Sequence, residues 1–452
     1  MPLPTLGILH DDLSPETLKV RFKARRQALM HGKEGILALS GLAGNPTQKT
    51  PWMYADSPVI QAPLFLYLTG LNQADCKLII TAQGNPLLFL PPYLEKAVFW
   101  EGPYLGFGDV ESHRFLAKIG FESIYPTAKF WSVLADTLPN ADPPVWTYWN
   151  QSDQKPNQIL RDQHWHFSRQ LHQFLNRHSG NAMHNLGPQA WQSWVTLDEG
   201  GRSSLMTANR LSAKALMSTL PVISTTRSEM DIAGKLRGEL QSRTPFGLSF
   251  PPIVASGAHA AILHYTSNDG DVAPNNLILI DFGAKWNAMP ADISRTFPRS
   301  GRFNPLQKRL YDVVLSTQQW VEKSARPGIR ISELNSLAWN HLEKALKQAL
   351  GPDGRAKRPY QHSPHNVGHL IGYQVHDGDA FREYRELPLK TGMAITNEPG
   401  LYGTFEATIN GKHYRETLGI RIEDTLYITA NGCENLTPFP KTTTDIEALL
   451  AV

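Results

Sequence analysis

Residues 277–297 of the chain read LILIDFGAKWNAMPADISRTF. Two apolar runs that flank a polar turn around Trp286 and Asn287 predict a β-hairpin. If those two residues form the loop, Asp281 lies directly opposite Asp292 on one face, with Cβ atoms roughly 4.5–5.5 Å apart. Because Trp-Asn is not a strong hairpin dipeptide, a longer loop is an alternative. Two like charges so placed repel each other, so the hairpin predicts either a cation site or two ordinary surface aspartates.

Three histidines follow in the stretch QHSPHNVGHLIGYQVHD. His365, His369 and His376 are four and seven positions apart, and the glycines between them allow close approach of backbone or ligand. The spacing does not decide between helix and strand. A single histidine is more often an ordinary core or surface residue, but this grouping indicates a lined cavity.

Two glutamates stand at strand ends further along the chain. In MAITNEPGLYG, Glu398 ends an apolar strand just before a Pro-Gly turn, where an inward carboxylate needs a partner. In GIRIEDTLYIT, alternation puts Arg421 and Glu423 on one face. Each glutamate alone also fits an ordinary surface or paired residue.

Together, two aspartates, one histidine and two glutamates make an oxygen-rich site with one imidazole. Such a set suits two divalent cations, which bridging carboxylates hold about 3.5–4 Å apart. Manganese is the first choice for this ligand chemistry, and cobalt and zinc are alternatives. The sequence therefore predicts a two-metal hydrolytic centre.

The composition is that of an ordinary soluble globular protein, with 41% hydrophobic and 19% charged residues in 452. This length predicts two domains. A net charge of +3 is small, so no nucleic-acid or membrane partner is expected. Cys76 and Cys433 have no CxxC spacing, which argues against a disulfide framework or thiolate zinc site. Since no targeting segment or bilayer-length apolar stretch is visible, we expect a cytoplasmic protein.

The order of elements predicts an α/β (α+β) protein. Residues 18–139 alternate helix-like and strand-like pieces, whereas residues 141–192 lack a period and predict loops plus one helix, with no chemistry assigned to their histidines. A long helical tract over 193–240 opens the second domain, which is expected to be β-like from Ile253 to the end. The predicted domains are 1–192 and 193–452.

The motifs D-x10-D, H-x3-H-x6-H, NEPG and RIED occur in the order found in the pita-bread metallopeptidases, and the chain resembles aminopeptidase P in particular. FLYLTGLNQADCKLII is similar to part of the aminopeptidase P amino-terminal domain. The resemblance implies a creatinase-like N-terminal α/β domain, used in oligomerisation and substrate access, followed by a pita-bread catalytic domain.

The resemblance also implies a role for each candidate residue. The implied metal ligands are Asp281, Asp292, His369, Glu398 and Glu423. The implied catalytic residues are His264, His365, His376, Glu398 and Arg421, and Trp100 and Arg385 are implied substrate contacts. In the family pattern Asp292 and Glu423 bridge the ions, Arg421 orients a ligand carboxylate, and Trp100 reaches a neighbouring subunit's site.

The activity implied is release of the N-terminal residue from peptides with proline in second position, by attack of a metal-bridging hydroxide on the Xaa-Pro bond. Glu398 is the expected general base, and His376 is the expected donor to the oxyanion. A homodimer or homotetramer is expected. Two alternatives stay open: a prolidase that cleaves Xaa-Pro dipeptides with the same ligands, and a catalytically inert binding protein.

Three local departures from the family pattern affect geometry rather than ligands. Phe282 follows Asp281 where the family usually has a small residue, and Asn397 precedes Glu398. The stretch VTLDEGGRSSLMTAN lacks the usual lysine-and-glutamate signature, and its double glycine is unfavourable in a helix interior.

Overall fold

The computed structural model describes residues 13–42, 61–138, 143–149, 163–378 and 382–451. Residues 1–12, which contributed to the expected cytoplasmic location, lie outside this described part. The chain divides into two compact units, Met1–Trp194 and Val195–Val452. Both units mix helices and strands, which confirms the predicted α/β (α+β) class. No helix in the described part is long and apolar enough to cross a membrane.

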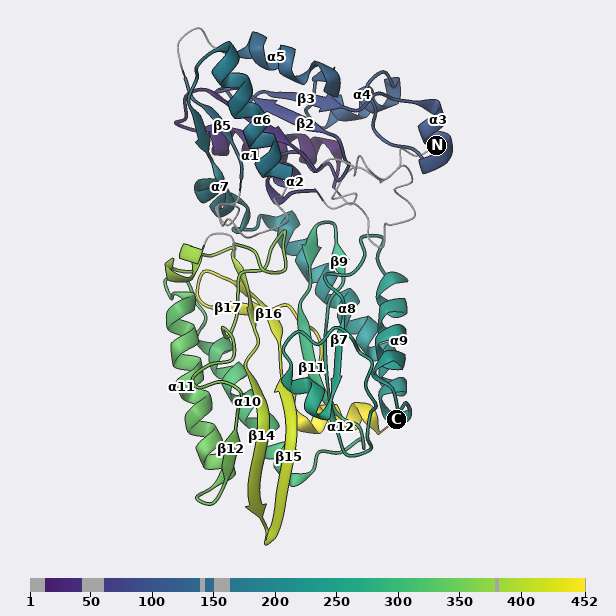
Figure 1. The fold of residues 1–452 in the computed structure, drawn as a ribbon, viewed down its shortest axis with the longest axis vertical. Coiled ribbons are helices and arrows are strands. Elements are labelled where there is room, and N and C mark those ends of the chain that lie inside the picture. The colour runs from purple at the N-terminus through teal and green to yellow at the C-terminus, as the bar shows by residue number, and fades with distance from the viewer. Residues whose placement is uncertain (1–12, 43–60, 139–142, 150–162, 379–381, 452) are drawn as a thin grey trace. The chain divides into compact units, whose positions relative to one another are not determined.

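The first unit is built on a six-stranded sheet in the order β4-β3-β2-β1-β5-β6 (Figure 1). Its strands are β1 (Ile36–Ser40), β2 (Lys77–Ile80), β3 (Pro86–Leu90), β4 (Ser123–Pro126), β5 (Val145–Thr147) and β6 (Met183–Asn185). Its helices are α1 (Pro15–Met30), α2 (Pro63–Thr69), α3 (Glu95–Glu101), α4 (Val110–Lys118), α5 (Phe130–Thr137), α6 (Gln163–His178) and α7 (Gly187–Trp194), with a short 3-10 turn η2 (Thr127–Lys129). The first four residues of β1 are buried on successive faces, so both faces of the sheet are covered there.

The expectation of loops plus one helix over residues 141–192 was wrong. The described part of this segment contains two strands, β5 and β6, and two helices, α6 and α7. Each strand has three residues, too few to show alternation in the sequence, and β5 forms by pairing with β1 in parallel. Helix α6 contributes Phe167, Leu171 and Leu175 to a core shared with Ile36.

The second unit contains three three-stranded sheets among its described residues, in the orders β11-β8-β7, β12-β14-β15 and β13-β16-β17. Its strands are β7 (Ile253–Ser256), β8 (Leu277–Phe282), β9 (Lys285–Trp286), β10 (Met289–Pro290), β11 (Ile293–Pro298), β12 (Arg355–Lys357), β13 (Ala394–Asn397), β14 (Gly400–Ile409), β15 (Lys412–Arg421), β16 (Asp424–Ile428) and β17 (Cys433–Asn435). Its helices are α8 (Glu199–Thr225), α9 (Glu229–Gln241), α10 (Pro305–Ser324), α11 (Ile331–Leu350) and α12 (Thr443–Leu450), with 3-10 turns η4 (Gly257–Ala261) and η5 (Arg382–Glu386). In the view of Figure 1, α9 lies to the right of the strands of this unit and α11 to their left.

The predicted β character from Ile253 to the end was wrong for α10, α11 and α12. Helix α10 begins with a capping box, in which Asn304 and Gln307 satisfy each other's backbone N–H groups. Its buried face repeats at helical spacing through Leu306, Leu310 and Val314. Both signals are present in the sequence. The helix was missed because the strand-like segments on either side of it led to a β prediction for the whole stretch.

The helical tract expected over residues 193–240 is divided between α8 and α9, with further residues before and between them. Helix α8 begins at Glu199, so the double glycine lies in its first turn and not in its interior. The Asp198 side chain caps this turn by accepting a hydrogen bond of 3.0 Å from the Gly201 N–H. The departure from the family pattern therefore costs little helix stability.

The hairpin of residues 277–298 forms, but its register differs from the predicted one. The two-residue loop is Asn287-Ala288, since Trp286 pairs with Met289. Asn287 adopts a φ of 55°, a left-handed conformation that asparagine tolerates better than most residues. Asp281 therefore pairs with Ser294 and not with Asp292. Because side chains alternate with a period of two, this shift of two positions keeps both aspartates on the same face.

Glu229, the first residue of α9, anchors the segment that carries His264. Its fully buried carboxylate accepts hydrogen bonds from the N–H groups of Ser256 at 2.6 Å and Gly270 at 2.8 Å. It also accepts one from the hydroxyl of Tyr265, the neighbour of His264, at 2.9 Å. One side chain thus ties both ends and the middle of this segment to a helix.

We expect Glu229→Ala to lower the free energy of unfolding by about 3 kcal/mol, because several buried donors lose their acceptor. Urea denaturation followed by circular dichroism measures this change. Asp231→Ala removes an exposed carboxylate from the same helix and should change the stability far less. Equal stability of the two variants would contradict the anchoring role.

Candidate metal centre

Three potential ligands converge in the second unit. Asp292 lies just before β11, His369 in the segment before β13, and Glu423 between β15 and β16. All three are buried, and one ligand atom from each lies within 4.8 Å of the others. Glu423 approaches Asp292 because its N–H donates a hydrogen bond of 3.0 Å to the carbonyl oxygen of Ser294.

The hydrogen bonding of His369 leaves Nε2 free to bind a cation. Nδ1 lies 3.0 Å from the carbonyl oxygen of Leu370, which can only accept, so we assign the ring proton to Nδ1. Nε2 then presents its lone pair to Asp292 Oδ2 at 3.6 Å and Glu398 Oε1 at 3.5 Å. A lone pair facing two carboxylates is unfavourable unless a cation or proton lies between them, so the residues present fit a metal ion.

Thr396 holds two of the candidate ligands together. Its Oγ1 donates to Glu398 Oε1 at 3.2 Å and accepts from the N–H of His369 at 3.0 Å. Glu398 Oε2 also lies 3.5 Å from His365 Nδ1. The Glu398 carboxylate is thus placed beside both His365 and His369.

Asp281 is paired with Arg421 through one oxygen. Arg421 Nη2 donates to Asp281 Oδ2 at 2.6 Å, and its Nε donates to Ser294 Oγ at 2.9 Å. The other oxygen, Oδ1, is buried and has no hydrogen-bond donor among the described residues. A buried carboxylate oxygen without a hydrogen-bond donor, beside Asp292, is a suitable ligand atom for a bound cation.

Four carboxylates and one arginine make this site strongly negative. Burial and the neighbouring charge of Asp281 and Glu398 raise the pKa of Asp292 well above its usual value, although Arg421 opposes the shift. Burial and the charge of Asp292 raise the pKa of Glu423 in the same way. The excess negative charge is of the size that divalent cations offset.

A cavity of 590 Å³ opens onto these carboxylates. The five predicted ligands line it, and so do His264, His365, His376, Arg385 and Arg421. The His376 ring stacks on the ring of His369 with centroids 4.0 Å apart. The structure therefore brings ten of the eleven predicted site residues to one cavity.

The eleventh residue, Trp100, belongs to the first unit. It lies on α3, where 67% of its surface is exposed, and its neighbour Phe99 is 82% exposed. This exposure shows that Trp100 is not a core residue of the described part of the chain. Two large exposed aromatic side chains on one short helix need another explanation.

Three supporting residues were missed from the sequence: Ser294, Thr396 and Tyr402. Tyr402 accepts a hydrogen bond of 3.0 Å from Arg421 Nη1, and its hydroxyl lies 3.0 Å from His365 Nε2. Ser294 Oγ donates to Glu423 Oε2 at 2.7 Å. Ser294 and Thr396 each stand two positions from a ligand and so share its strand face, a signal that the sequence offered.

Comparison with known families identifies the chain's class. Residues 203–430 match the family model of metallopeptidase family M24, and residues 22–146 match that of the aminopeptidase P, N-terminal domain. The chain belongs to metallopeptidase family M24. The predicted family and the predicted order of the two domains are confirmed.

Individual relatives agree with this assignment. Mouse Xaa-Pro aminopeptidase 3 is 26% identical over 97% of this chain and 87% of its own length. Xaa-Pro aminopeptidase 2 of Streptomyces coelicolor is 36% identical over 45% of each chain. Among solved structures, E. coli aminopeptidase P with the inhibitor Pro-Leu superimposes with a TM-score of 0.77 at 25% identity, covering 97% of this chain and 98% of that one. The Pseudomonas aeruginosa aminopeptidase PepP gives 0.78 at 25% identity, covering 96% and 98%.

Binding of Mn²⁺ to the metal-free protein should release protons and raise the melting temperature. The pKa values of Asp292 and Glu423 are raised without metal, so a cation that binds these carboxylates competes with protons up to a higher pH than at ordinary carboxyls. Carboxyls with raised folded-state pKa values stabilise the metal-free protein at low pH and lose that effect as the pH rises through those values. The gain in melting temperature on adding Mn²⁺ should therefore grow with pH. Scanning calorimetry at several pH values, with titrations in two buffers of different ionisation enthalpy, measures both effects; tight binding without proton release would contradict them.

Proposed function

We propose that the chain is a metallo-aminopeptidase that releases the first residue of peptides whose second residue is proline. The observation that carries this proposal is the convergence of all five candidate ligands on one cavity in the M24 part of the chain. The second support is the match of residues 22–146 to the aminopeptidase P, N-terminal domain. The relatives named Xaa-Pro aminopeptidase agree with this substrate class.

Asp281, Asp292, His369, Glu398 and Glu423 would hold two divalent cations. Manganese is the first candidate because the set is rich in carboxylates, with cobalt and zinc as alternatives. Bound cations would supply Lewis-acid polarisation of the scissile carbonyl and an activated water. A cytoplasmic location is proposed for the chain; the Arabidopsis thaliana relative is named a mitochondrial peptidase.

Glu398 is proposed to move the proton of the reaction. Its Oε1 is oriented by Thr396, and its side chain is more accessible from the cavity than those of Asp292 and Glu423. It can therefore take a proton from the attacking water and return it to the prolyl nitrogen. That nitrogen carries no hydrogen in a peptide bond, so it needs this proton in order to leave.

The histidines and arginines of the cavity are proposed to orient the substrate. His376 would donate to the carbonyl oxygen as it gains charge, held in place by stacking on His369. His264 would lie near the substrate's N-terminus, and Arg385, which also lines the cavity, would contact the substrate. Arg421 fixes Asp281 through their 2.6 Å ion pair.

The prolidase alternative differs in the length of its substrate. We expect an Xaa-Pro-Yaa tripeptide to be cleaved faster than the matching Xaa-Pro dipeptide at equal concentration, and peptides without proline should not react. The assay is chromatographic release of the first amino acid by the Mn²⁺-loaded protein. Asp292→Asn is the control for metal dependence and should lose nearly all turnover. Cleavage of the dipeptide alone would make the chain a prolidase, and no cleavage by a metal-loaded protein would favour the inert binding protein.

We propose further that the chain forms a homodimer or homotetramer in which Trp100 contacts the substrate in a neighbouring copy. The support is its exposure together with that of Phe99, which leaves rigid apolar surface free to cover a partner.

Trp100→Ala should therefore raise the Michaelis constant for proline peptides several-fold and leave the melting temperature and metal content nearly unchanged. The reason is that an exposed indole contributes little to its own fold. Steady-state kinetics, thermal scans and light scattering measure these effects, with Val110→Ala, another exposed apolar residue of the same unit, as control. A monomeric wild type with full activity would end the proposal.

A further inference from the structure

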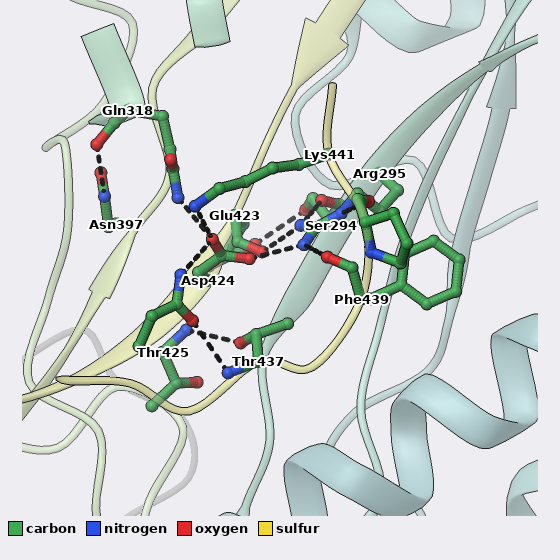
Figure 2. A network of polar contacts seen from close by, with 12 residues as sticks. Ser294, Arg295, Gln318, Asn397, Glu423, Asp424, Thr425, Thr437, Phe439 and Lys441 are labelled. Atoms are coloured by element: carbon green, nitrogen blue, oxygen red, sulfur yellow. Dashed lines mark hydrogen bonds and ion pairs between the residues drawn. The ribbon is translucent and has the colours of Figure 1, made fainter. Parts of the chain in front are cut away.

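A second buried polar network lies directly behind the candidate ligand Glu423 (Figure 2). At its centre, Arg295 on β11 and Asp424 at the start of β16 are fully buried and form an ion pair of 2.6 Å. Neither residue lines the cavity. Arg295 follows Ser294 in the chain and Asp424 follows Glu423, and successive residues of a strand face opposite sides. The pair therefore occupies the side of these strands that faces away from the candidate site.

Arg295 ties together the backbone of the two segments that meet at the site. Its Nη1 donates to the carbonyl oxygens of Ser294 at 2.9 Å and Glu423 at 2.7 Å. The side chains of these same two residues meet on the opposite face, where Ser294 Oγ donates to Glu423 Oε2 at 2.7 Å. The guanidinium thus fixes the main chain at the point where Glu423 enters the site.

The remaining contacts hold Arg295 and Asp424 in place. Arg295 Nε and Nη2 donate to the carbonyl oxygens of residues 440 and 439 at 3.0 and 2.9 Å, so every N–H of the guanidinium has an acceptor. Asp424 Oδ2 accepts from Gln318 Nε2 at 2.6 Å and from Lys441 Nζ at 2.7 Å. Helix α10 and the C-terminal segment therefore hold Asp424, the residue that follows the candidate ligand Glu423 in the chain.

This network is balanced in charge, unlike the site in front of it. Arg295 and Lys441 face Asp424 and Glu322, since Lys441 Nζ is also 2.8 Å from Glu322 Oε2. Burial alone would raise the pKa of Asp424, but the two cations hold it below its usual value. The network therefore requires no metal ion, and its link to the site is the contact of Arg295 with the main chain of Glu423.

We propose that Arg295 and Asp424 are positioning residues of the metal centre, which set the distance between the Glu423 and Asp292 carboxylates that a shared cation requires. The inference rests on the proposed function, in which both carboxylates are metal ligands, and on their ligand atoms lying within 4.8 Å of each other. A planar guanidinium suits this task because it reaches several acceptors in fixed directions, which a lysine ammonium cannot.

The test is the affinity of chelator-stripped, full-length protein for Mn²⁺ alone, with unbound Mn²⁺ measured by electron paramagnetic resonance. Arg295→Lys keeps the charge and loses the planar fork, and we expect it to weaken Mn²⁺ binding about 10–100-fold. Arg299→Lys is the matched control, because Arg299 also donates to main-chain carbonyls, those of Thr226 and Ser224, away from the ligand segments. It should bind Mn²⁺ as the wild type does.

The melting temperature of each stripped variant separates positioning from folding, since a merely structural role would lower it without changing the Mn²⁺ affinity of the folded protein. If Arg295→Lys does not fold, Lys441→Met carries the test. It keeps the apolar stem, removes one cation from Asp424, and should weaken Mn²⁺ binding several-fold. A wild type without a tight site for Mn²⁺, Co²⁺ or Zn²⁺ overturns the proposed function and this inference with it. Tight binding by the wild type with equal binding by the folded variants overturns this inference alone.

Discussion

Electrostatic repulsion among four carboxylates, of which three are buried and one is half-buried, is the constraint on which the second unit depends. Asp281, Asp292, Glu398 and Glu423 share one cavity, and Arg421 is the cation paired with them in the described part of the chain. Like charges in a poorly solvated space cost several kcal/mol each unless protons or cations neutralise them. The raised pKa values of Asp292 and Glu423 are the response of the metal-free protein to that cost. The same cost is what favours a multivalent cation at this place.

Because side chains alternate along a strand, the same segments can supply both the candidate ligands and the residues that support them. Three candidate ligands each have a supporting residue two positions away in the chain. The pairs are Asp292 with Ser294, Glu398 with Thr396, and Glu423 with Arg421. Side chains two apart share a face, so each supporting group lies on the same side as the candidate ligands: Thr396 donates to Glu398, Ser294 to Glu423 and Arg421 to Asp281. Asn397, which lies between Thr396 and Glu398, and Arg295, which follows Ser294, do not line the cavity and hydrogen-bond to the main chain of other segments. The same short segments therefore carry both the candidate ligands and the residues that hold them in place.

The candidate ligands could be predicted because carboxylates at strand ends and grouped histidines are visible in the sequence, and the ordered motifs pointed to a family. The pairing of Asp281 with Ser294 could not, because it depends on which residue takes the left-handed turn position, here Asn287. Strands β5 and β6 exist only through pairing across the sheet, so no local pattern reveals them. Helix α10 did leave a local signal in its capping residues. Its omission was an error of interpretation and not a limit of the sequence.

The two polar networks on opposite faces of β11 and β16 respond differently to their surroundings. The network of Arg295 and Asp424 is neutral in sum, and its cations hold the pKa of Asp424 below the usual value, so we expect changes in pH or metal supply to affect it little. The site of Asp292 and Glu423 is unbalanced and open to a cavity, so it changes with both. Because the balanced network fixes the main chain, the response of the site is confined to side chains and their protons. A cation that enters then meets ligands already near their final positions, and little of its binding energy is spent on ordering the backbone.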